Sequence, residues 1–290
     1  MKQHSPEWYD AQYNNRARIP EHPAILQHWA DSSAAAYRRL GGVLDVAYGG
    51  DPSERLDLFP AARPNAPVLL YIHGGYWRAL DKSDQAFVAP PFVDAGAMVA
   101  LANYALCPAV SVEHIVLQMV RALAWLFGNA ARYGGDPQRI VVAGHSAGGH
   151  LAAMLLACDW PAVAPGLPAD LPKSALSLSG VFDLEPLRHA PFLAPDIGLT
   201  QRSARRLSPA HMPPPRGALV SVVGGDESEE FLRQQALIQS AWGAQVRAEV
   251  VPGRNHMNVL HELVQPGSRT HHHALRLLGL AAGPAAQETP

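Results

Sequence analysis

The sequence has little cysteine, no long apolar run and almost no net charge, and each shortage excludes a class of protein. Cys107 and Cys158 are the only cysteines, and we expect a buried free thiol at Cys158 rather than a disulfide or a metal site. No apolar run approaches the ~20 residues that a membrane helix needs. A formal net charge of -2 gives no electrostatic reason to bind nucleic acid or an anionic membrane. We therefore expect a small-molecule partner.

The opening stretch MKQHSPEWYDAQYNN also lacks the apolar core of a signal peptide, which predicts a cytoplasmic protein. A hydrophobic share of 48% and a charged share of 17% are typical of a globular protein with a sizeable core. A chain of 290 residues is long enough for one large α/β domain. Nothing in the composition calls for a cofactor, and a homodimer is left open.

The pattern of residues predicts an N-terminal extension, one α/β domain and a short tail. Residues 1–40 contain no strand pattern, and we expect them to pack on the domain formed by residues 41–282. Segments 161–172 and 188–215 lie between the expected elements and are candidate lids. The tail, residues 283–290, is expected to be frayed.

Strand-like and helix-like segments alternate along the domain. Two short alternating runs on either side of Gly-Gly-Asp-Pro-Ser predict an antiparallel entry. Further strands are expected at 66–73, 97–104, 140–143, 175–183, 218–227 and 246–256, and helices at 111–135, 151–158, 229–243 and near 274–280. This order predicts an α/β fold with a mostly parallel sheet of about eight strands and helices on both faces. Active sites of such sheets lie at the carboxyl ends of the strands.

The stretch RIVVAGHSAGGHLAAMLLA has the spacing of a catalytic serine. Within it, Gly144-His145-Ser146-Ala147-Gly148 reads as G-x-S-x-G. Glycines on either side remove side chains where a strained turn passes close to its neighbours. G-x-S-x-G also occurs by chance in glycine-rich loops, but here an apolar strand precedes it and a helix follows. This context favours Ser146 as a nucleophile.

A serine nucleophile needs backbone donors for the oxyanion that develops during the reaction. The stretch His73-Gly74-Gly75-Tyr76-Trp77 follows the third strand, where serine hydrolases of this architecture place such N–H groups. We expect the N–H groups of Gly75 and Tyr76, in a loop shaped by Gly74, to join that of Ala147. A tight turn for packing alone would explain the glycines but not their location.

Chain order selects the base among fourteen histidines. His256 follows the last strand and comes after both the serine and the acidic candidates, as in the order Ser, acid, His. The run His271–His273 falls on one helix, and we interpret it as a solvated face rather than a metal cluster. The acid is Asp226 or Glu227 at the end of the penultimate strand, and the residues alone do not choose between them.

Together, the stretches HGGYW, GHSAGGHL, SGVFDLEPL, VVGGDESEEFLRQ and GRNHMNV resemble the kynurenine formamidase (arylformamidase) branch of the α/β-hydrolase fold, near the hormone-sensitive-lipase-like esterases. The opening YNNRARIPEHP looks like that of bacterial members. The resemblance implies Ser146 as nucleophile, His256 as base and the HGGYW loop as the oxyanion hole. It places Glu227 in the acid's position, where several relatives carry Asp, so we expect Glu227, with Asp226 as the alternative.

The resemblance implies a metal-independent serine hydrolase acting on an aryl formamide. A substrate pocket bordered by Tyr76, Trp77, His145 and Phe182 would suit such a substrate, although aromatic residues beside a glycine loop are as often core residues. The same site cleaves esters as well as amides, so a carboxylesterase for short acyl chains is the alternative. An alternative of another class, a non-catalytic binding protein of this fold, would normally have lost part of the triad.

Overall fold

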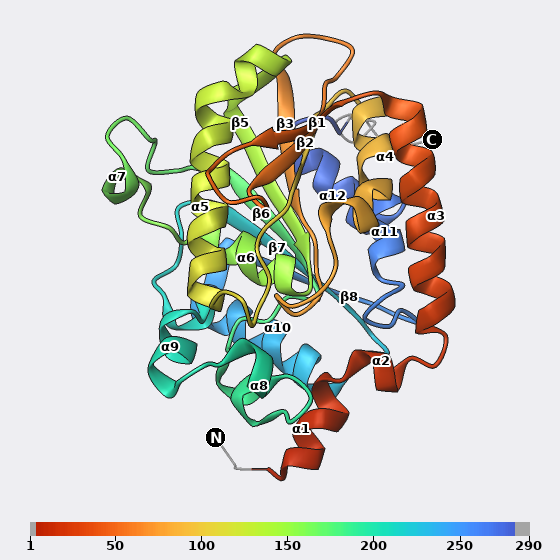
Figure 1. Ribbon diagram of the computed structural model, residues 1–290, viewed down its shortest axis with the longest axis vertical. Helices are drawn as coiled ribbons and strands as arrows, with labels where there is room; N and C mark the ends of the chain where they lie inside the picture. The colour runs from red at the N-terminus through yellow and green to blue at the C-terminus, as the bar shows by residue number, and fades with distance from the viewer. Residues whose placement is uncertain (1–3, 282–290) are drawn as a thin grey trace, which may run out of the picture.

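An eight-stranded sheet runs through the centre of the computed structural model, which describes residues 4–281 (Figure 1). Its order is β1-β2-β4-β3-β5-β6-β7-β8. The strands are β1 (Val43–Ala47), β2 (Arg55–Phe59), β3 (Ala66–Ile72), β4 (Met98–Ala102), β5 (Gly135–His145), β6 (Ser174–Leu178), β7 (Ala218–Gly224) and β8 (Val246–Val251). β2 pairs antiparallel with β1 and β4, and every other pair is parallel. The predicted fold class is confirmed.

Side-chain alternation along β3 explains why helices cover both faces of the sheet. Val68, Leu70 and Ile72 join one apolar cluster, while Leu69 and Tyr71 join the other. Helices α5 (Val112–Asn129), α6 (Ala147–Leu156) and α10 (Glu229–Trp242) cover the first face. Helices α3 (His22–Leu40), α4 (Ala89–Asp94), α11 (Leu260–Val264) and α12 (Arg269–Leu277) cover the second (Figure 1).

Shorter helices complete the connections. They are α1 (Pro6–Tyr13), α2 (Asn15–Arg18), α7 (Trp160–Val163), α8 (Ala194–Ile197) and α9 (Gln201–Arg206), with 3-10 turns η1 (Lys82–Val88), η2 (Ala130–Tyr133), η3 (Glu185–His189), η4 (Pro209–His211) and η5 (Gly243–Gln245). Ser111 caps α5 by accepting the N–H of His114 with its side-chain hydroxyl. None of the helices in residues 4–281 is both long and apolar enough to cross a membrane.

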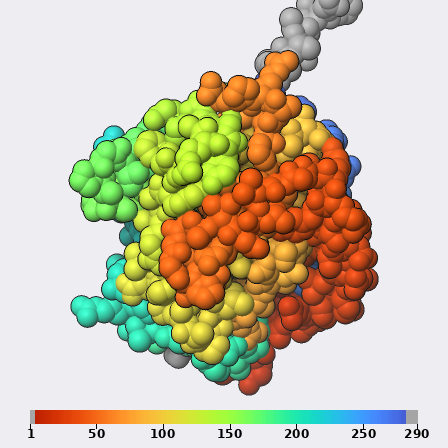
Figure 2. Space-filling model, turned by 45° about the horizontal axis from the view of Figure 1, so that its top comes forward, coloured from red at the N-terminus to blue at the C-terminus, as the bar shows by residue number. Residues whose placement is uncertain are grey.

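Residues 4–40 contain the helices α1, α2 and α3. Buried hydrogen bonds fix this region: the Tyr13 hydroxyl donates to Glu230 on α10 at 2.6 Å, and the Gln234 amide donates to the Tyr13 oxygen at 3.1 Å. Trp29 of α3 is buried in the cluster on the second face. Figure 2 shows α3 and the β1–β2 edge as one red-to-orange surface. The N-terminal region therefore contacts α10 on the first face of the sheet and the apolar cluster on the second face.

The interpretation of His271–His273 as a solvated face was wrong. Only His272 is exposed, whereas His271 and His273 are buried. His271 donates from Nδ1 to the Leu263 carbonyl at 2.9 Å, and His273 Nε2 lies 2.6 Å from a Glu249 carboxylate oxygen. The reason is helical spacing, because His271 shares the buried face of α12 with apolar residues three and seven positions later.

Both cysteines are free thiols. Cys107 is buried. Cys158 is only partly buried, because it lies just after the end of α6, so the prediction of a buried thiol at Cys158 was wrong. The predicted frayed tail, residues 283–290, lies outside the described residues.

Candidate active site

Ser146 occupies the sharp turn between β5 and α6. β5 ends at His145 and α6 begins at Ala147, so a single residue joins the two elements. The Ser146 backbone has φ +56° and ψ -117°, a conformation that a residue with a side chain adopts only where its surroundings impose it. Its N–H donates to the Leu178 carbonyl on β6 at 2.8 Å, which fixes the turn against the neighbouring strand.

Gly144 and Gly148 permit this turn because neither position has room for a side chain. A β-carbon at Gly148 would lie 2.0 Å from the carbonyl oxygen of Ile72. A β-carbon at Gly144 would lie 2.3 Å from the backbone of Gly148. Both distances are far shorter than van der Waals contact. The two glycines thus let β5, β3 and α6 meet closely around the serine.

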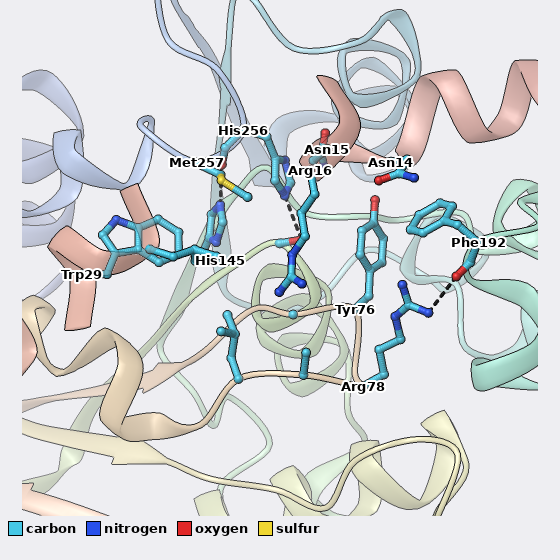
Figure 3. A pocket seen from close by; sticks show the side chains of 15 residues that line it. Asn14, Asn15, Arg16, Trp29, Tyr76, Arg78, His145, Phe192, His256 and Met257 are labelled. Atoms are coloured by element: carbon cyan, nitrogen blue, oxygen red, sulfur yellow. Dashed lines mark hydrogen bonds between the residues drawn. The ribbon is translucent and has the colours of Figure 1, made fainter. Parts of the chain in front are cut away.

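Three buried side chains form one hydrogen-bonded chain. Ser146 Oγ lies 3.0 Å from His256 Nε2, and His256 Nδ1 lies 2.7 Å from Glu227 Oε2. With Nδ1–H donating to the carboxylate, Nε2 carries the lone pair that can accept the serine proton. Glu227 follows β7 and His256 follows β8, so both reach Ser146 from the carboxyl edge of the sheet. Figure 3 shows the His256 ring pointing into the cavity.

The structure brings Glu227, and not Asp226, to His256. Asp226 is exposed, whereas the Glu227 side chain is 0% exposed. The second Glu227 oxygen accepts the Gly224 N–H at 2.8 Å and the Ser179 hydroxyl. These donors orient the carboxylate and help to stabilise its charge away from water. Sequence reasoning missed Ser179, although its place directly after β6 was an available signal.

The loop after β3 turns with unusual backbone angles at Gly75, Tyr76 and Trp77, where φ is +107°, +51° and +57°. Within the part of the chain that the structure describes, the N–H groups of Gly75 and Tyr76 donate no hydrogen bond. Ala147 is the first residue of α6, so its N–H has no partner inside the helix. Three backbone donors are therefore free near the serine.

Gly74 and Tyr104 shape this loop from behind. A β-carbon at Gly74 would lie 3.0 Å from the His145 carbonyl oxygen and 3.3 Å from the Ser146 β-carbon, so the loop passes directly beside the elbow. The Tyr104 hydroxyl lies 3.0 Å from the His73 carbonyl and 3.3 Å from the Gly74 carbonyl. These contacts hold the loop without using its N–H groups.

A cavity of about 110 Å³ opens in front of Ser146 (Figure 3). Its lining comes from the N-terminal region, the loop after β3, the elbow, the segment between η3 and α8, and the segment after β8: Asn14, Asn15, Arg16, Leu26, Trp29, Gly75, Tyr76, Arg78, Ala79, Leu80, His145, Ser146, Phe192, His256 and Met257. Sequence reasoning missed the N-terminal contribution. The only signal was the resemblance of YNNRARIPEHP to related sequences, which assigned no role to those residues.

Trp77 and Phe182, which we predicted at the substrate pocket, do not line this cavity. Both are buried in the main apolar cluster. Trp77 contacts His150 of α6 edge to face at 5.0 Å, because the positive φ angles of the loop send consecutive side chains in different directions. Tyr76 lines the cavity while Trp77 packs under it. These two aromatic residues therefore support the fold rather than a ligand.

His145 lines the cavity, but its ring is used by the protein. Nε2–H donates to the His256 carbonyl at 2.7 Å. Burial, together with the neighbouring His256, lowers the pKa of His145 to about 3, so the ring is neutral at physiological pH. His145 thus fixes the loop that carries His256.

Of the candidate lids, segment 188–215 contributes Phe192 to the cavity, whereas no residue of segment 161–172 lines it. In Figure 1 the helix α7, which overlaps the start of the latter segment, lies well away from α8. Within residues 4–281 no three His, Cys, Asp or Glu residues are grouped so that they could hold a metal ion.

Comparisons with known proteins agree with this architecture. The family model described as BD-FAE matches residues 56–159, and the carboxylesterase family model matches residues 114–235. The kynurenine formamidase of Salmo salar is 28% identical over 96% of this chain and 95% of its own length. That of Drosophila melanogaster is 30% identical over 64% of this chain and 63% of its own.

Two solved structures extend the comparison. A suggested thioesterase from Silicibacter sp. TM1040 superimposes with a TM-score of 0.79 at 30% identity, covering 90% of this chain and 96% of that one. Esterase LipW from Mycobacterium marinum superimposes with a TM-score of 0.68 at 20% identity, over 90% and 87% of the two chains, which is a likeness of fold alone.

The chain belongs to the α/β-hydrolase superfamily and is a hydrolase of the esterase type. It is similar to the hormone-sensitive-lipase-like members of that superfamily, and its relatives include kynurenine formamidases, as the sequence predicts.

Proposed function

We propose that this chain is a serine hydrolase that cleaves aryl formamides, with Ser146 as nucleophile, His256 as base and Glu227 as the acid. The observation that carries the proposal is the continuous hydrogen-bonded chain from Ser146 Oγ through His256 to the buried Glu227, at 3.0 Å and 2.7 Å. A serine hydroxyl is a weak nucleophile unless a base within hydrogen-bond reach takes its proton.

The proposed reaction has two halves. Ser146 Oγ attacks the formyl carbon while His256 takes the hydroxyl proton, and the N–H groups of Gly75, Tyr76 and Ala147 stabilise the oxyanion. His256 then gives the proton to the departing amine, which leaves a formyl ester on the serine. Water, activated by His256, attacks that ester and releases formate. Glu227 orients the ring and stabilises its charged form in both halves.

The aryl formamide is favoured over other acyl substrates for two reasons. The curated relatives that match most of this chain are kynurenine formamidases. The cavity also has an aromatic lining from Trp29, Tyr76 and Phe192, which suits a planar ring on the leaving amine. Both observations support the proposal without fixing the natural substrate.

The direct test is the initial rate on N-formyl-L-kynurenine beside p-nitrophenyl acetate, with Ser146→Ala as the control. We expect a kcat/KM for the formamide of about 10⁴ M⁻¹s⁻¹ or more, abolished in the variant. Formamide turnover that survives in a folded Ser146→Ala protein would overturn the mechanism.

A carboxylesterase for short acyl chains is the second candidate, because the carboxylesterase family model matches residues 114–235. Ester turnover without formamide turnover would favour it and leave the proposed catalytic residues unchanged. A non-catalytic binding protein is disfavoured, since such a protein would have no reason to keep a serine, a histidine and a buried carboxylate within hydrogen-bond distance.

A further inference from the structure

The cavity in front of Ser146 is cationic. Its lining contains two arginines, Arg16 and Arg78, and no aspartate or glutamate, as far as the described residues show. Glu227 lies behind His256 and is fully buried. The lining itself therefore presents positive charge to a substrate, and the carboxylates of Glu21, Asp226 and Glu227 line a separate pocket that Asn15 also borders.

Arg78 is already neutralised by the protein. Its guanidinium forms an ion pair with Asp196, donates to the Phe192 carbonyl at 2.7 Å and lies over the Phe192 ring at 5.4 Å. These contacts occupy N–H donors of the Arg78 guanidinium and compensate its positive charge. Arg78 thus fixes the segment that carries Phe192 and has little capacity left for a ligand.

Arg16 is different. It lies on the short helix α2, is exposed, and makes no ion pair or side-chain hydrogen bond with any residue between 4 and 281. Figure 3 shows its side chain extending from α2 toward the loop that carries Tyr76 and Arg78. A guanidinium group presents two parallel N–H donors that match a carboxylate. Arg16 therefore brings an uncompensated bidentate donor to the cavity.

Asn15, the neighbouring residue, adds an independent observation. Its side chain is only 6% exposed and lines the same cavity, yet its Nδ2 has no hydrogen-bond partner in the described structure. A buried donor without a partner is unfavourable, and a ligand oxygen that accepts from it would offset that cost. Asn15 and Arg16 thus present unused N–H donors side by side in the chain.

The junction of α1 and α2, where Asn15 and Arg16 lie, is fixed relative to Ser146. The Tyr76 hydroxyl donates to the Tyr13 carbonyl at 2.6 Å, which ties the loop beside the serine to the end of α1. Asp10 accepts the Phe192 N–H at 3.1 Å from the same helix. A ligand group bound by Asn15 and Arg16 at this junction would therefore lie at a defined distance from the reacting carbonyl.

We propose that Asn15 and Arg16 form a carboxylate subsite, and that the substrate is an acyl compound whose non-reacting part carries a carboxylate. The proposal rests on the proposed function for the position of the reacting carbonyl. It narrows the substrate class to aryl formamides or esters that carry a carboxylate.

The test measures binding separately from turnover. In the Ser146→Ala background, calorimetry gives Kd for formanilide, which is neutral, and for 2-, 3- and 4-formamidobenzoate, which are anionic. We expect at least one anion to bind about 10-fold more tightly than formanilide, the gain of one charge-assisted contact of about 1.4 kcal/mol. Arg16→Gln should remove most of this preference, and Arg16→Lys should retain part of it.

Two further variants control the result. Arg18→Gln removes the same charge from the same short helix, but Arg18 does not line the cavity, so the preference should survive. Asn15→Asp keeps the size of a buried side chain and places a carboxylate in the subsite, so it should abolish the preference. An unchanged preference in Arg16→Gln, an equal loss in Arg18→Gln, or no binding of any of the four compounds would overturn the subsite.

The two proposals fail in different ways. If the wild-type protein binds the anions through Arg16 but hydrolyses no formamide, the subsite stands and the proposed function falls. If it hydrolyses formamides through Ser146 but Arg16→Gln leaves the ratio of anionic to neutral kcat/KM unchanged, the function stands and the subsite falls.

Discussion

The elbow (residues 144–148) and the N-terminal segment (residues 4–40) meet at the same cavity but are constructed in opposite ways. The elbow depends on tight local geometry, with one strained residue between a strand and a helix and glycines at every close approach. The N-terminal segment depends on contacts across the chain, such as the hydrogen bond from Tyr13 to Glu230, 217 positions later. The first kind of construction is visible in a short stretch of sequence, and the second is not.

If the elbow supplies the chemistry, changes to the groups that serve Ser146 should have the largest effect. We expect Glu227→Gln to lower kcat by about 10³- to 10⁴-fold, because the amide cannot hold the imidazole in the required tautomer or stabilise its charge. Asp226→Asn is the matched control, and as an exposed change it should alter the rate by about twofold at most. Equal losses in the two variants would contradict the assignment of the acid.

The steric construction of the elbow can be tested by stability. Gly148→Ala places a β-carbon 2.0 Å from the Ile72 carbonyl oxygen, and we expect the free energy of unfolding to fall by at least about 3 kcal/mol. The control is Gly128→Ala on α5, where the added methyl group meets nothing within 4 Å. That variant should gain about 0.5–1 kcal/mol from better helix propensity. Urea unfolding measures both, and similar values would argue against a close-packed elbow.

Removing the hydrogen bond that joins the loop beside the elbow to the N-terminal segment should lower activity by a smaller factor. Tyr76→Phe removes the hydroxyl that donates to the Tyr13 carbonyl and leaves that carbonyl without its partner. We expect kcat/KM to fall about 10-fold, equivalent to about 1.4 kcal/mol, as the oxyanion loop loses its tie to the N-terminal segment. Tyr133→Phe serves as the control, because its hydroxyl makes no hydrogen bond in the described structure. If both variants retain full activity, the N-terminal segment does not position the loop.

The last prediction concerns the effect of pH on the helix that follows the elbow. Burial on α6 lowers the pKa of His150 from 6.5 to about 4, despite its hydrogen bond to the Leu207 carbonyl. Between these pH values the unfolded chain binds a proton that the folded protein does not. The free energy of unfolding should therefore fall as the pH decreases from about 6.5 toward 4, by at most about 1.4 kcal/mol per pH unit from this group.

His150→Gln should make that pH dependence shallower, and the part that remains includes His145, whose pKa is also lowered by burial. His272→Gln, at an exposed position, should leave the dependence unchanged. Denaturant unfolding at pH 7.0, 6.0 and 5.0 measures the slopes. A slope in His150→Gln as steep as that of the wild type would show that other groups cause the acid sensitivity.

Much of the fold could be predicted from local pattern. Strand β3 is an apolar run because helices cover both of its faces, and the G-x-S-x-G spacing reflects collisions that only glycine avoids. The carboxyl edge of the sheet then limited where the base and acid could lie, which pointed to His256 and to the pair Asp226 and Glu227. The choice within that pair required geometry, because adjacent residues at a turn differ only in which way they face.

The cavity wall could not be predicted in the same way. Asn15 and Arg16 come more than a hundred positions before Ser146, and nothing in their local sequence shows that α1 and α2 fold back over the sheet edge. The prediction that Trp77 and Phe182 border the substrate pocket was wrong for the opposite reason. A side chain that is near the site in sequence can still turn into the core, where burial of a large aromatic ring is favourable.

Covalent labelling tests the central claim most directly, namely that Ser146 is the activated nucleophile. The protein is treated with an aryl phosphonofluoridate and followed by activity and by intact mass, with peptide mapping of the product. The account predicts one adduct per chain, on Ser146, formed in step with the loss of activity, absent from Ser146→Ala and slowed in Glu227→Gln. Full activity after complete modification of Ser146, or inactivation with the adduct on another residue, would contradict it.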